Sequence, residues 1–405
     1  MQVLKFGGSS VANATRISRV LDIVEQKARE DRVIVICSAI SGCTDQLIAM
    51  GQVEGERRES LLAPLKQQHY DIVTRLFTGV ERNAVKAELD ILFEELLTVP
   101  GDECQTYGEL ISTRIIARKL ACEGLSTLWI DSRSVVIKDN EARTYSKIAS
   151  AVGSHREVRV FVAPGFIAGD GYGHVTNLGR GGSDYSAAIF ANCLNASEVT
   201  IWKDVDGLLN ADPKRFPQTV KIPHISYPEA IELAFYGATV IHPKTMKPLQ
   251  NKNIALHVRS FIHPENEPTV IDGRPDSGPS VPSYIVKDRQ TLVSFSPRDY
   301  SFMNEHNLKT IFAACDSLRI HANMIQTSAL MLSLCIDSDE NRLSALIDCL
   351  REQFSIKYNE GLQLFTVRHR AGEQPSEIET EFMKGKKVIV KQGSRSTLQF
   401  VLKTV

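Results

Sequence analysis

The chain opens with the stretch MQVLKFGGSSVANATRISRVLDIVEQKAREDRVIVICSAI, residues 1–40. Residues 1–6 alternate in the manner of a strand, and residues 13–29 repeat apolar side chains along one helical face. The run 32–39 is nearly all apolar, which is typical of a strand buried on both faces. Strand, helix and buried strand in this order predict a parallel sheet with helices packed against it.

The same alternation of elements continues to about residue 260. We expect helices at 108–123 and 184–193, and short strands at 128–130, 158–163 and 198–202. Residues 1–262 are therefore predicted to form a three-layer α/β sandwich around a mostly parallel sheet. In such sheets ligands gather at the carboxyl ends of the strands, so the loops that follow the strands hold the candidate sites.

Residues 263–288 differ in composition, because proline, glycine and charged residues dominate HPENEP at 263–268 and GRPDSGP at 273–279. This composition predicts a linker. Residues 289–405 then show the β-α-β-β-α-β order of a ferredoxin-like module, followed by a shorter unit. The C-terminal region is expected to be α+β, with one full module and a shorter second one.

Composition limits the broad class of protein. With 405 residues, two or three domains are expected, and 43% hydrophobic and 23% charged residues are usual for a globular protein. A net charge of −1 gives no reason to expect nucleic-acid or membrane partners, and the N-terminus lacks a signal-peptide pattern. The eight cysteines form no C-x-x-C pair, so we expect reduced thiols, no zinc site and a cytoplasmic protein.

The loop KFGGSS, residues 5–10, lies between the first strand and a helix. Its glycines allow backbone N–H groups to approach an anion, the helix N-terminus favours negative charge, and Lys5 can neutralise a phosphoryl group. It is not a Walker A loop, because G-x-x-x-x-G-K is absent. A simple glycine turn beside an edge lysine explains the local sequence equally well.

Two further segments are ambiguous by themselves. The sequence SAISGCTD at 38–45 offers hydroxyl groups to a polar ligand, although Thr44 or Asp45 can equally cap the next helix. Glu109 opens a helix, where a carboxylate is electrostatically favourable without any function. Its functional interpretation is a partner for a substrate ammonium group.

The sequence NLGRGGSDYS, residues 177–186, is the most informative stretch. Three glycines surround Arg180, so the backbone can wrap a ligand while the guanidinium binds a carboxylate or phosphate. Asp184 could be a plain helix cap, but so dense a glycine loop between a strand and a helix favours ligand binding.

The segment WKDVDGLL at 202–209, with Asp212 and Lys214 after it, can face a nucleotide or magnesium, or merely cap turns. His242, before Pro243, is interpreted as structural. The sequence contains no recognisable Ser/His/Asp triad, metal-ligand set or G-x-G-x-x-G motif. These absences disfavour hydrolases, zinc enzymes and NAD-dependent dehydrogenases.

Taken in order, these segments resemble the aspartate kinase family of the amino-acid kinase fold. The match runs from residues 5–10 through GRGGSDY at 179–185 to Gly237-Ala238 and His242-Pro243, and covers about the first 260 residues. Each motif is weak alone, whereas the ordered set is specific. The resemblance implies transfer of the γ-phosphate of ATP, with Mg²⁺, to the β-carboxylate of L-aspartate, the first step towards lysine, threonine and methionine.

The resemblance also implies roles for single residues. Lys5 and Asp184 would be catalytic, with Lys5 stabilising the γ-phosphate and Asp184 orienting that lysine. No protein ligand to the metal is implied, because Mg²⁺ enters with ATP. The residues implied to contact ATP are Lys5, Gly7, Gly8, Ser9, Lys203, Asp204, Asp212 and Lys214. Those implied to contact L-aspartate are Thr44, Glu109, Arg180 and Ser183.

Two positions depart from the family pattern. Thr239 stands where family members often carry a lysine near the phosphates, and Lys244 is a candidate replacement. Leu209 stands where a tyrosine is often found near the adenine. The first departure concerns a phosphate contact, and the second concerns nucleotide affinity.

The C-terminal region resembles ACT domains, which bind amino acids at paired interfaces, and so implies feedback by lysine or threonine. It also implies a homodimer or higher oligomer, and a monofunctional enzyme because no dehydrogenase region follows. Two other readings stay open: a kinase of the same fold acting on glutamate, acetylglutamate, carbamate or UMP, and an amino-acid sensor without turnover. The residues implied to contact the effector are Ser296, Asp299, Tyr300, Asn323, Met324 and Thr327.

Overall fold

The structure is a computed structural model that describes residues 1–238, 241–274, 281–370, 372 and 374–405. The chain divides into two compact units. The first comprises Met1–Leu208, Pro223–Ile231 and Thr239–Asp276, and the second comprises Leu209–Ile222, Glu232–Ala238 and Ser277–Val405. No helix in these described ranges is long and apolar enough to cross a membrane.

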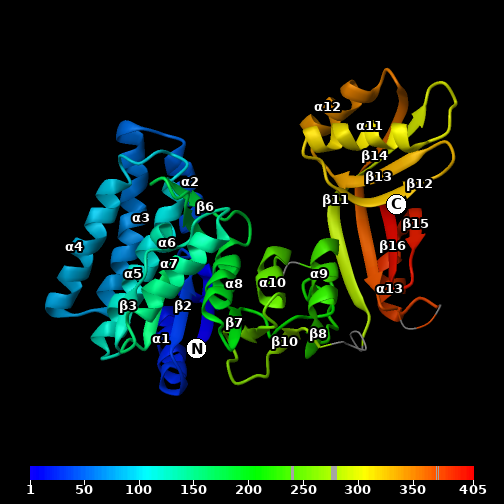
Figure 1. Ribbon diagram of the computed structural model, residues 1–405. Coiled ribbons are helices and arrows are strands. Elements are labelled where there is room, and N and C mark those ends of the chain that lie inside the picture. Colours follow the sequence, from blue (N-terminus) through cyan, green and yellow to red (C-terminus); the bar gives the residue numbers. More distant parts are fainter. Residues whose placement is uncertain (239–240, 275–280, 371, 373) are drawn as a thin grey trace. The chain divides into compact units, whose positions relative to one another are not determined.

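The first unit is built on an eight-stranded sheet in the order β3-β4-β2-β1-β7-β9-β10-β8 (Figure 1). All neighbouring strands run parallel except the pair β9 and β10. The mostly parallel sheet expected from the sequence is therefore confirmed. The strands are β1 (Gln2–Phe6), β2 (Val33–Cys37), β3 (Thr127–Trp129), β4 (Val160–Pro164), β7 (Glu198–Lys203), β8 (His224–Ser226), β9 (Ala255–Ser260) and β10 (Thr269–Asp272).

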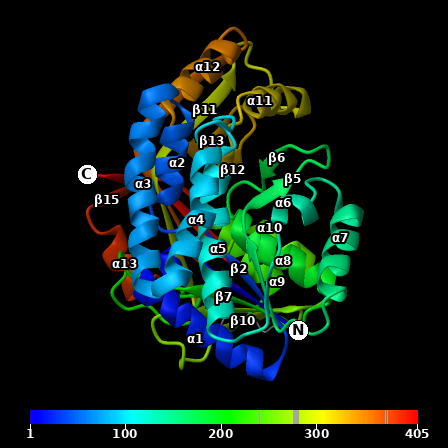
Figure 2. The same ribbon diagram turned by 90° about the vertical axis from the view of Figure 1, so that its left-hand side faces the viewer.

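Helices cover both faces of this sheet, which confirms the three-layer arrangement. Figure 2 shows α3, α4 and α5 on one side of β2 and β7, and α7 and α8 on the other. A hairpin of β5 (Ile167–Gly169) and β6 (Val175–Asn177) lies outside the main sheet. The helices are α1 (Ala14–Glu30), α2 (Cys43–Gly51), α3 (Gly55–Leu76), α4 (Gly79–Glu95), α5 (Tyr107–Cys122), α6 (Ser132–Val135), α7 (Glu141–Gly153), α8 (Gly182–Leu194), α9 (Tyr227–Tyr236) and α10 (Pro243–Gln250).

Successive side chains of β1 point alternately to the helices on the two faces of the sheet. Leu4 and Phe6 are fully buried in the hydrophobic cluster that contains α1 and α5. Because successive side chains of a strand point to opposite faces, Lys5 points to the face on which α8 packs. The strand therefore places a charged residue beside the N-terminal end of α8.

The predicted linker at 263–288 is corrected by the structure. Its residues Thr269–Asp272 form strand β10, which pairs with β9 and β8 in the first unit. Residues from Ser283 onward belong to a long strand of the second unit. The short apolar sequence TVID is enclosed by proline- and glycine-rich segments, so composition alone could not reveal a strand that exists through pairing with its neighbours.

The second unit contains one antiparallel six-stranded sheet in the order β12-β13-β11-β14-β16-β15. Strands β11 and β14 each have 15 residues and serve both the full module and the shorter one, so the expected α+β region is confirmed with a shared sheet. The elements are β11 (Ser283–Pro297), α11 (Glu305–Ser317), β12 (Ala322–Thr327), β13 (Leu332–Asp337), α12 (Glu340–Leu350), β14 (Phe354–Arg368), α13 (Glu377–Met383), β15 (Lys386–Gly393) and β16 (Thr397–Thr404).

Candidate active site

The turn after β1 brings the backbone close to the segment that follows β2. A Cβ atom at Gly8 would lie 2.8 Å from the carbonyl oxygen of Ala39, so only glycine fits this approach without a shift. A Cβ atom at Gly7 would lie 3.6 Å from Nζ of Lys5, which places the lysine amine over the turn. The lysine amine and the glycine turn thus lie close together, as a phosphate site requires.

Three buried or partly buried charges form the centre of the site. Nζ of Lys5 lies 2.6 Å from Oδ1 of Asp184, and Nζ of Lys203 donates to Oδ2 of Asp184 at 3.3 Å. Lys5 is 5% exposed and Asp184 is 6% exposed. One carboxylate therefore holds two ammonium groups that come from β1 and β7.

The protonation of this group follows from the competing effects of burial and charge. Burial raises the pKa of Asp184, but the charges of Lys5 and Lys203 outweigh it and hold the pKa below its usual value. Burial and the nearby charge of Lys5 lower the pKa of Lys203, against the opposing effect of Asp184. The two lysines and Asp184 together carry a net positive charge, which an anionic ligand can neutralise.

The glycine loop before α8 adopts left-handed backbone conformations at Gly179 (φ 72°) and Gly181 (φ 70°). A Cβ atom at Gly181 would lie 2.7 Å from Cβ of His242. His242 is the N-cap residue of α10, where its Nδ1 accepts a hydrogen bond from the backbone N–H of Lys244 at 3.2 Å. The loop is thus shaped by close packing, and the side chain of Arg180 stays exposed.

Glu109 lies in the first turn of α5 and is only 4% exposed. Its Oε2 atom has no hydrogen-bond partner among the described residues. Burial raises the pKa of Glu109 to about 8, against smaller lowering effects of a backbone hydrogen bond at Ala39 and the charge of Lys5. A buried carboxyl oxygen that lacks a partner is well placed to receive a cationic ligand group.

Lys5, Asp184, Glu109 and the glycine loop before α8 line one cavity of about 480 Å³ in the first unit. The sequence missed Gln105 and Phe166, which also line it. Gln105 precedes Glu109 by four residues on the turn that leads into α5, so helical spacing could have indicated it. The predicted site residues that line the cavity are Lys5, Gly8, Thr44, Glu109, Arg180, Ser183 and Asp184.

Other predicted ATP contacts lie beside this cavity. Lys203 reaches it through Asp184, as described above. Nη1 of Arg16 lies 3.0 Å from Oδ1 of Asp204 and 3.0 Å from the carbonyl oxygen of Ser9, so this arginine joins two predicted ATP residues. Arg16 was not singled out from the sequence, because nothing local distinguishes it from other helical arginines.

The remaining predicted ATP contacts belong to the second unit. The backbone N–H of Lys214 donates to Oδ1 of Asp212 at 2.9 Å, which makes this segment a turn closed by its own carboxylate. Leu209 forms an isolated bridge with Lys221. The ATP roles of Asp212 and Lys214 stay predictions, and Thr239 lies outside the described residues.

The predicted effector residues differ in burial. Asn323 is 6% exposed, donates to Gln290 and Asp337 at 2.8 and 2.9 Å, and accepts from Nζ of Lys287 at 2.7 Å. Met324 is buried, and Thr327 is exposed at the end of β12. Ser296 is half-buried at the end of β11, with Asp299 and Tyr300 exposed in the loop that follows. Their effector role is untested and stays a prediction.

No group of three or more His, Cys, Asp or Glu residues that could hold a metal ion occurs in the portion of the chain that the structure describes.

Comparison with known proteins gives matches to amino acid kinases, among them proteins named aspartokinases. The family model described as the amino acid kinase family matches residues 1–260. Lysine-sensitive aspartokinase 3 of Escherichia coli (strain K12) is 31% identical over 360 residues, which cover 83% of this chain and 78% of that protein. Aspartokinase 1, chloroplastic, of Arabidopsis thaliana is 29% identical over 362 residues, and the chain spans 63% of its length.

Solved structures of similar fold include E. coli aspartokinase III in complex with aspartate and ADP. The TM-score to that structure is 0.82 at 26% identity, and the match covers 100% of this chain and 96% of that one. The same enzyme in complex with lysine and aspartate gives a TM-score of 0.80 at 26% identity, covering 99% and 95%.

Proposed function

The chain belongs to the amino acid kinase family and, within it, to the aspartokinases, and from this premise we propose that it transfers the γ-phosphate of ATP to the β-carboxylate of L-aspartate. The product is the acyl phosphate 4-phospho-L-aspartate. The observation that carries the proposal is the pairing of Lys5 and Lys203 with Asp184, where Lys5 and Asp184 line a cavity that also holds Glu109 and Arg180.

The charges of the cavity complement both ends of the amino acid. The exposed guanidinium of Arg180 can bind the α-carboxylate through two parallel hydrogen bonds. The partnerless carboxyl oxygen of Glu109 accepts the substrate ammonium, and the hydroxyl groups of Thr44 and Ser183 supply further polar contacts. With both ends held, the β-carboxylate is the group left free to react.

The chemistry needs charge neutralisation more than proton transfer. A side-chain carboxylate is ionised at neutral pH, so it attacks the γ-phosphorus without a general base. Its obstacle is repulsion by the triphosphate. Lys5, Lys203 and the amides of Gly7 and Gly8 oppose that repulsion, because fixed positive charge in a buried site stabilises the developing transition state.

Asp184 acts as a positioning residue in this scheme. It holds Lys5 and Lys203 at 2.6 and 3.3 Å without itself reacting. We expect Mg²⁺ to enter as its complex with ATP, where it screens the phosphate charge. This chain's own residues then hold the two substrates in line and keep the lysines oriented.

The second unit is proposed to bind a regulatory amino acid, with lysine as the first effector to test and threonine as the second. This proposal rests on the solved relative that holds lysine and on the ferredoxin-like order of the C-terminal elements. We also propose a homodimer or higher oligomer that pairs through this unit.

The activity is tested by supplying Mg²⁺-ATP and L-aspartate with hydroxylamine, which traps an acyl phosphate as the hydroxamate. Aspartyl hydroxamate is expected only when L-aspartate is present, and it should be lost in Lys5→Ala but retained in Lys147→Ala, an exposed lysine of α7. Hydroxamate formed from glutamate or acetylglutamate instead would assign another acceptor. A folded protein that binds ATP but yields no hydroxamate would overturn the proposal in favour of a sensor.

A further inference from the structure

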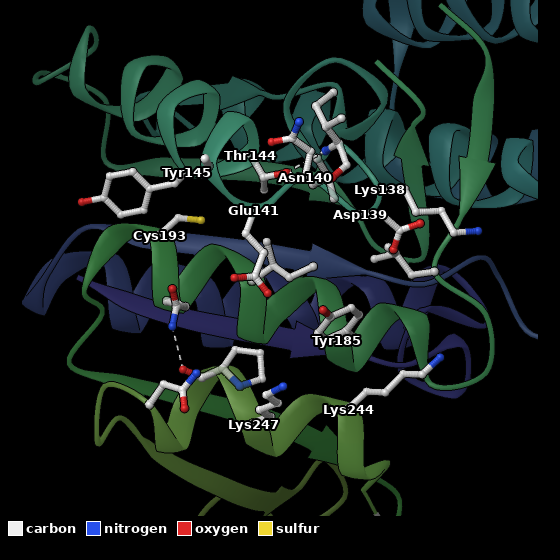
Figure 3. Close-up of a pocket in the computed structure, with 18 residues that line it drawn as sticks. Lys138, Asp139, Asn140, Glu141, Thr144, Tyr145, Tyr185, Cys193, Lys244 and Lys247 are labelled. Carbon is white, nitrogen blue, oxygen red and sulfur yellow. Dashed lines mark hydrogen bonds between the residues drawn. The ribbon is translucent and has the colours of Figure 1, made fainter. Parts of the chain in front are cut away.

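A second and larger cavity, of about 740 Å³, lies in the first unit between α7, α8 and α10 (Figure 3). It shares no lining residue with the cavity that holds Lys5 and Asp184. The two are nevertheless joined by α8, because Asp184 lines one cavity and the next residue, Tyr185, lines the other. The proposed phosphoryl transfer assigns no role to the second cavity.

One side of this cavity is apolar. Tyr185, Ile189 and Cys193 follow one another at spacings of four residues along α8, so they form a continuous strip on one helix face. Leu178 and Val136, both buried, extend the apolar surface. A volume of this size is within the range of cavities that hold small molecules.

One remaining wall carries two acids beside Lys138, whose Nζ donates to Oγ1 of Thr176 at 3.5 Å, and the other wall carries two lysines. Asp139 and Glu141 come from the segment that begins α7, and Lys244 and Lys247 come from α10. Figure 3 shows Glu141 on the α7 side reaching toward α8, with Lys244 and Lys247 on the helix below it. No ion pair joins any of these four side chains to another residue in the ranges that the structure describes. Opposite charges thus face one cavity without neutralising each other.

The pKa of Tyr185 supports the view that the carboxylate of Glu141 faces the cavity. Burial, followed by the negative charges of Glu141 and Asp139, raises the pKa of the Tyr185 phenol. Glu141 also acts to raise the pKa of Cys193, in the same direction as the larger effect of burial. The carboxylate of Glu141 therefore acts on groups of the apolar strip, as expected if it faces the cavity.

We propose that this cavity binds a free α-amino acid with a large apolar side chain. Its ammonium group would pair with Glu141, its carboxylate would pair with Lys247, assisted by Lys244, and its side chain would cover Ile189 and Cys193. A purely anionic ligand would meet Asp139 and Glu141, and a purely cationic one would meet the lysines of α10. Only a molecule with both charges and an apolar body satisfies all three surfaces.

Isothermal titration of the full chain with L-phenylalanine tests the proposal directly, in the absence of ATP and aspartate. Two derivatives, N-acetyl-L-phenylalanine and L-phenylalaninamide, each remove one of the two charges. We expect saturable binding of the free amino acid and at least about 10-fold weaker binding of each derivative, the usual effect of losing one charge-assisted hydrogen bond. Derivatives that bind as tightly as phenylalanine would overturn the proposal, as would the absence of saturable binding.

Variants locate the binding site. Glu141→Gln and Lys247→Gln should each weaken binding about 10-fold, whereas Lys147→Gln, an exposed lysine of α7 that does not line the cavity, should bind as wild type. Circular dichroism confirms that each variant is folded. If both cavity variants bind as wild type while Asn323→Ala loses binding, the amino acid lies in the second unit and the proposal is wrong. This result would leave the kinase proposal untouched, because hydroxamate formation is measured separately.

Discussion

The charged residues on one side of α8 are buried or partly buried and paired, whereas those on the other side are exposed and unpaired among the described residues. Asp184 is 6% exposed, and it holds both Lys5 and Lys203. One residue further on, the cavity at Tyr185 is bordered by Glu141 and Lys247, which are exposed and unpaired among the described residues. Buried charges must be paired because desolvation is costly, whereas exposed charges are kept solvated by water. The first face is thus organised before any ligand arrives, and the second leaves its charges available.

Lys5→Ala should have the largest effect. Removing the ammonium group that we propose neutralises the phosphates should lower kcat by about 10²–10³-fold, as for loss of one preorganised electrostatic contact. Hydroxamate formation at saturating substrates measures this rate, and Lys147→Ala provides the matched surface control. A kcat within about twofold of wild type would show that Lys5 is not catalytic.

Asp184→Asn should reduce both stability and activity. The change leaves two lysines without their shared carboxylate, so the free energy of unfolding should fall by about 3–5 kcal/mol, the usual result of breaking a buried ion pair. Urea unfolding measures this loss. Asp22→Asn, an exposed carboxylate of α1, should change stability by less than about 0.5 kcal/mol. Equal stability of the two variants would contradict the distinction between buried and exposed charges.

Glu109 should make aspartate binding depend on pH. With its pKa raised to about 8 by burial, Glu109 is mostly protonated in the free protein at pH 6 and cannot neutralise the substrate ammonium. The KM for aspartate should therefore fall about tenfold for each pH unit between 6 and 7, and level off above 8. Steady-state kinetics across this range measure the effect.

Two controls accompany the pH experiment. Glu109→Gln should raise KM and remove its pH dependence in this range, whereas Glu123→Gln, an exposed glutamate, should keep the wild-type profile. The ionisation of Glu109 also affects the stability of the fold. Because the folded pKa lies above the ordinary value of 4.5, stability from this group is full below pH 4.5 and declines as pH rises towards 8. A pH-independent KM in the wild type would contradict the role of Glu109.

Lys247→Gln should have the smallest effect on folding. The side chain is exposed and forms no ion pair with the described residues, so the free energy of unfolding should change by less than about 0.5 kcal/mol. Urea unfolding next to Asp184→Asn gives the comparison directly. A loss as large as that of Asp184→Asn would mean that the second cavity is a structural network like the first.

The sequence predicted the elements best where the pattern is local and strong. The buried run of β2, the helical face of α1 and the glycine-rich entry to α8 lie within one or two residues of their expected positions. It failed at β10, which was assigned to a linker, because four residues between proline-rich loops carry too little periodicity. It also could not assign Asp212 and Lys214 to the second unit, since neighbours in sequence do not reveal which core a segment joins.

By itself the sequence determined the order of the motifs, the alternation of strands and helices, and the presence of the charged residues that form the candidate site. Only the tertiary structure decided that Asp184 holds Lys5 and Lys203 together, and that Oε2 of Glu109 is buried without a hydrogen-bond partner among the described residues. The reason is physical. Periodicity reports which face of one element is apolar, but pairing and desolvation depend on residues that strand order and helix packing bring together from distant positions.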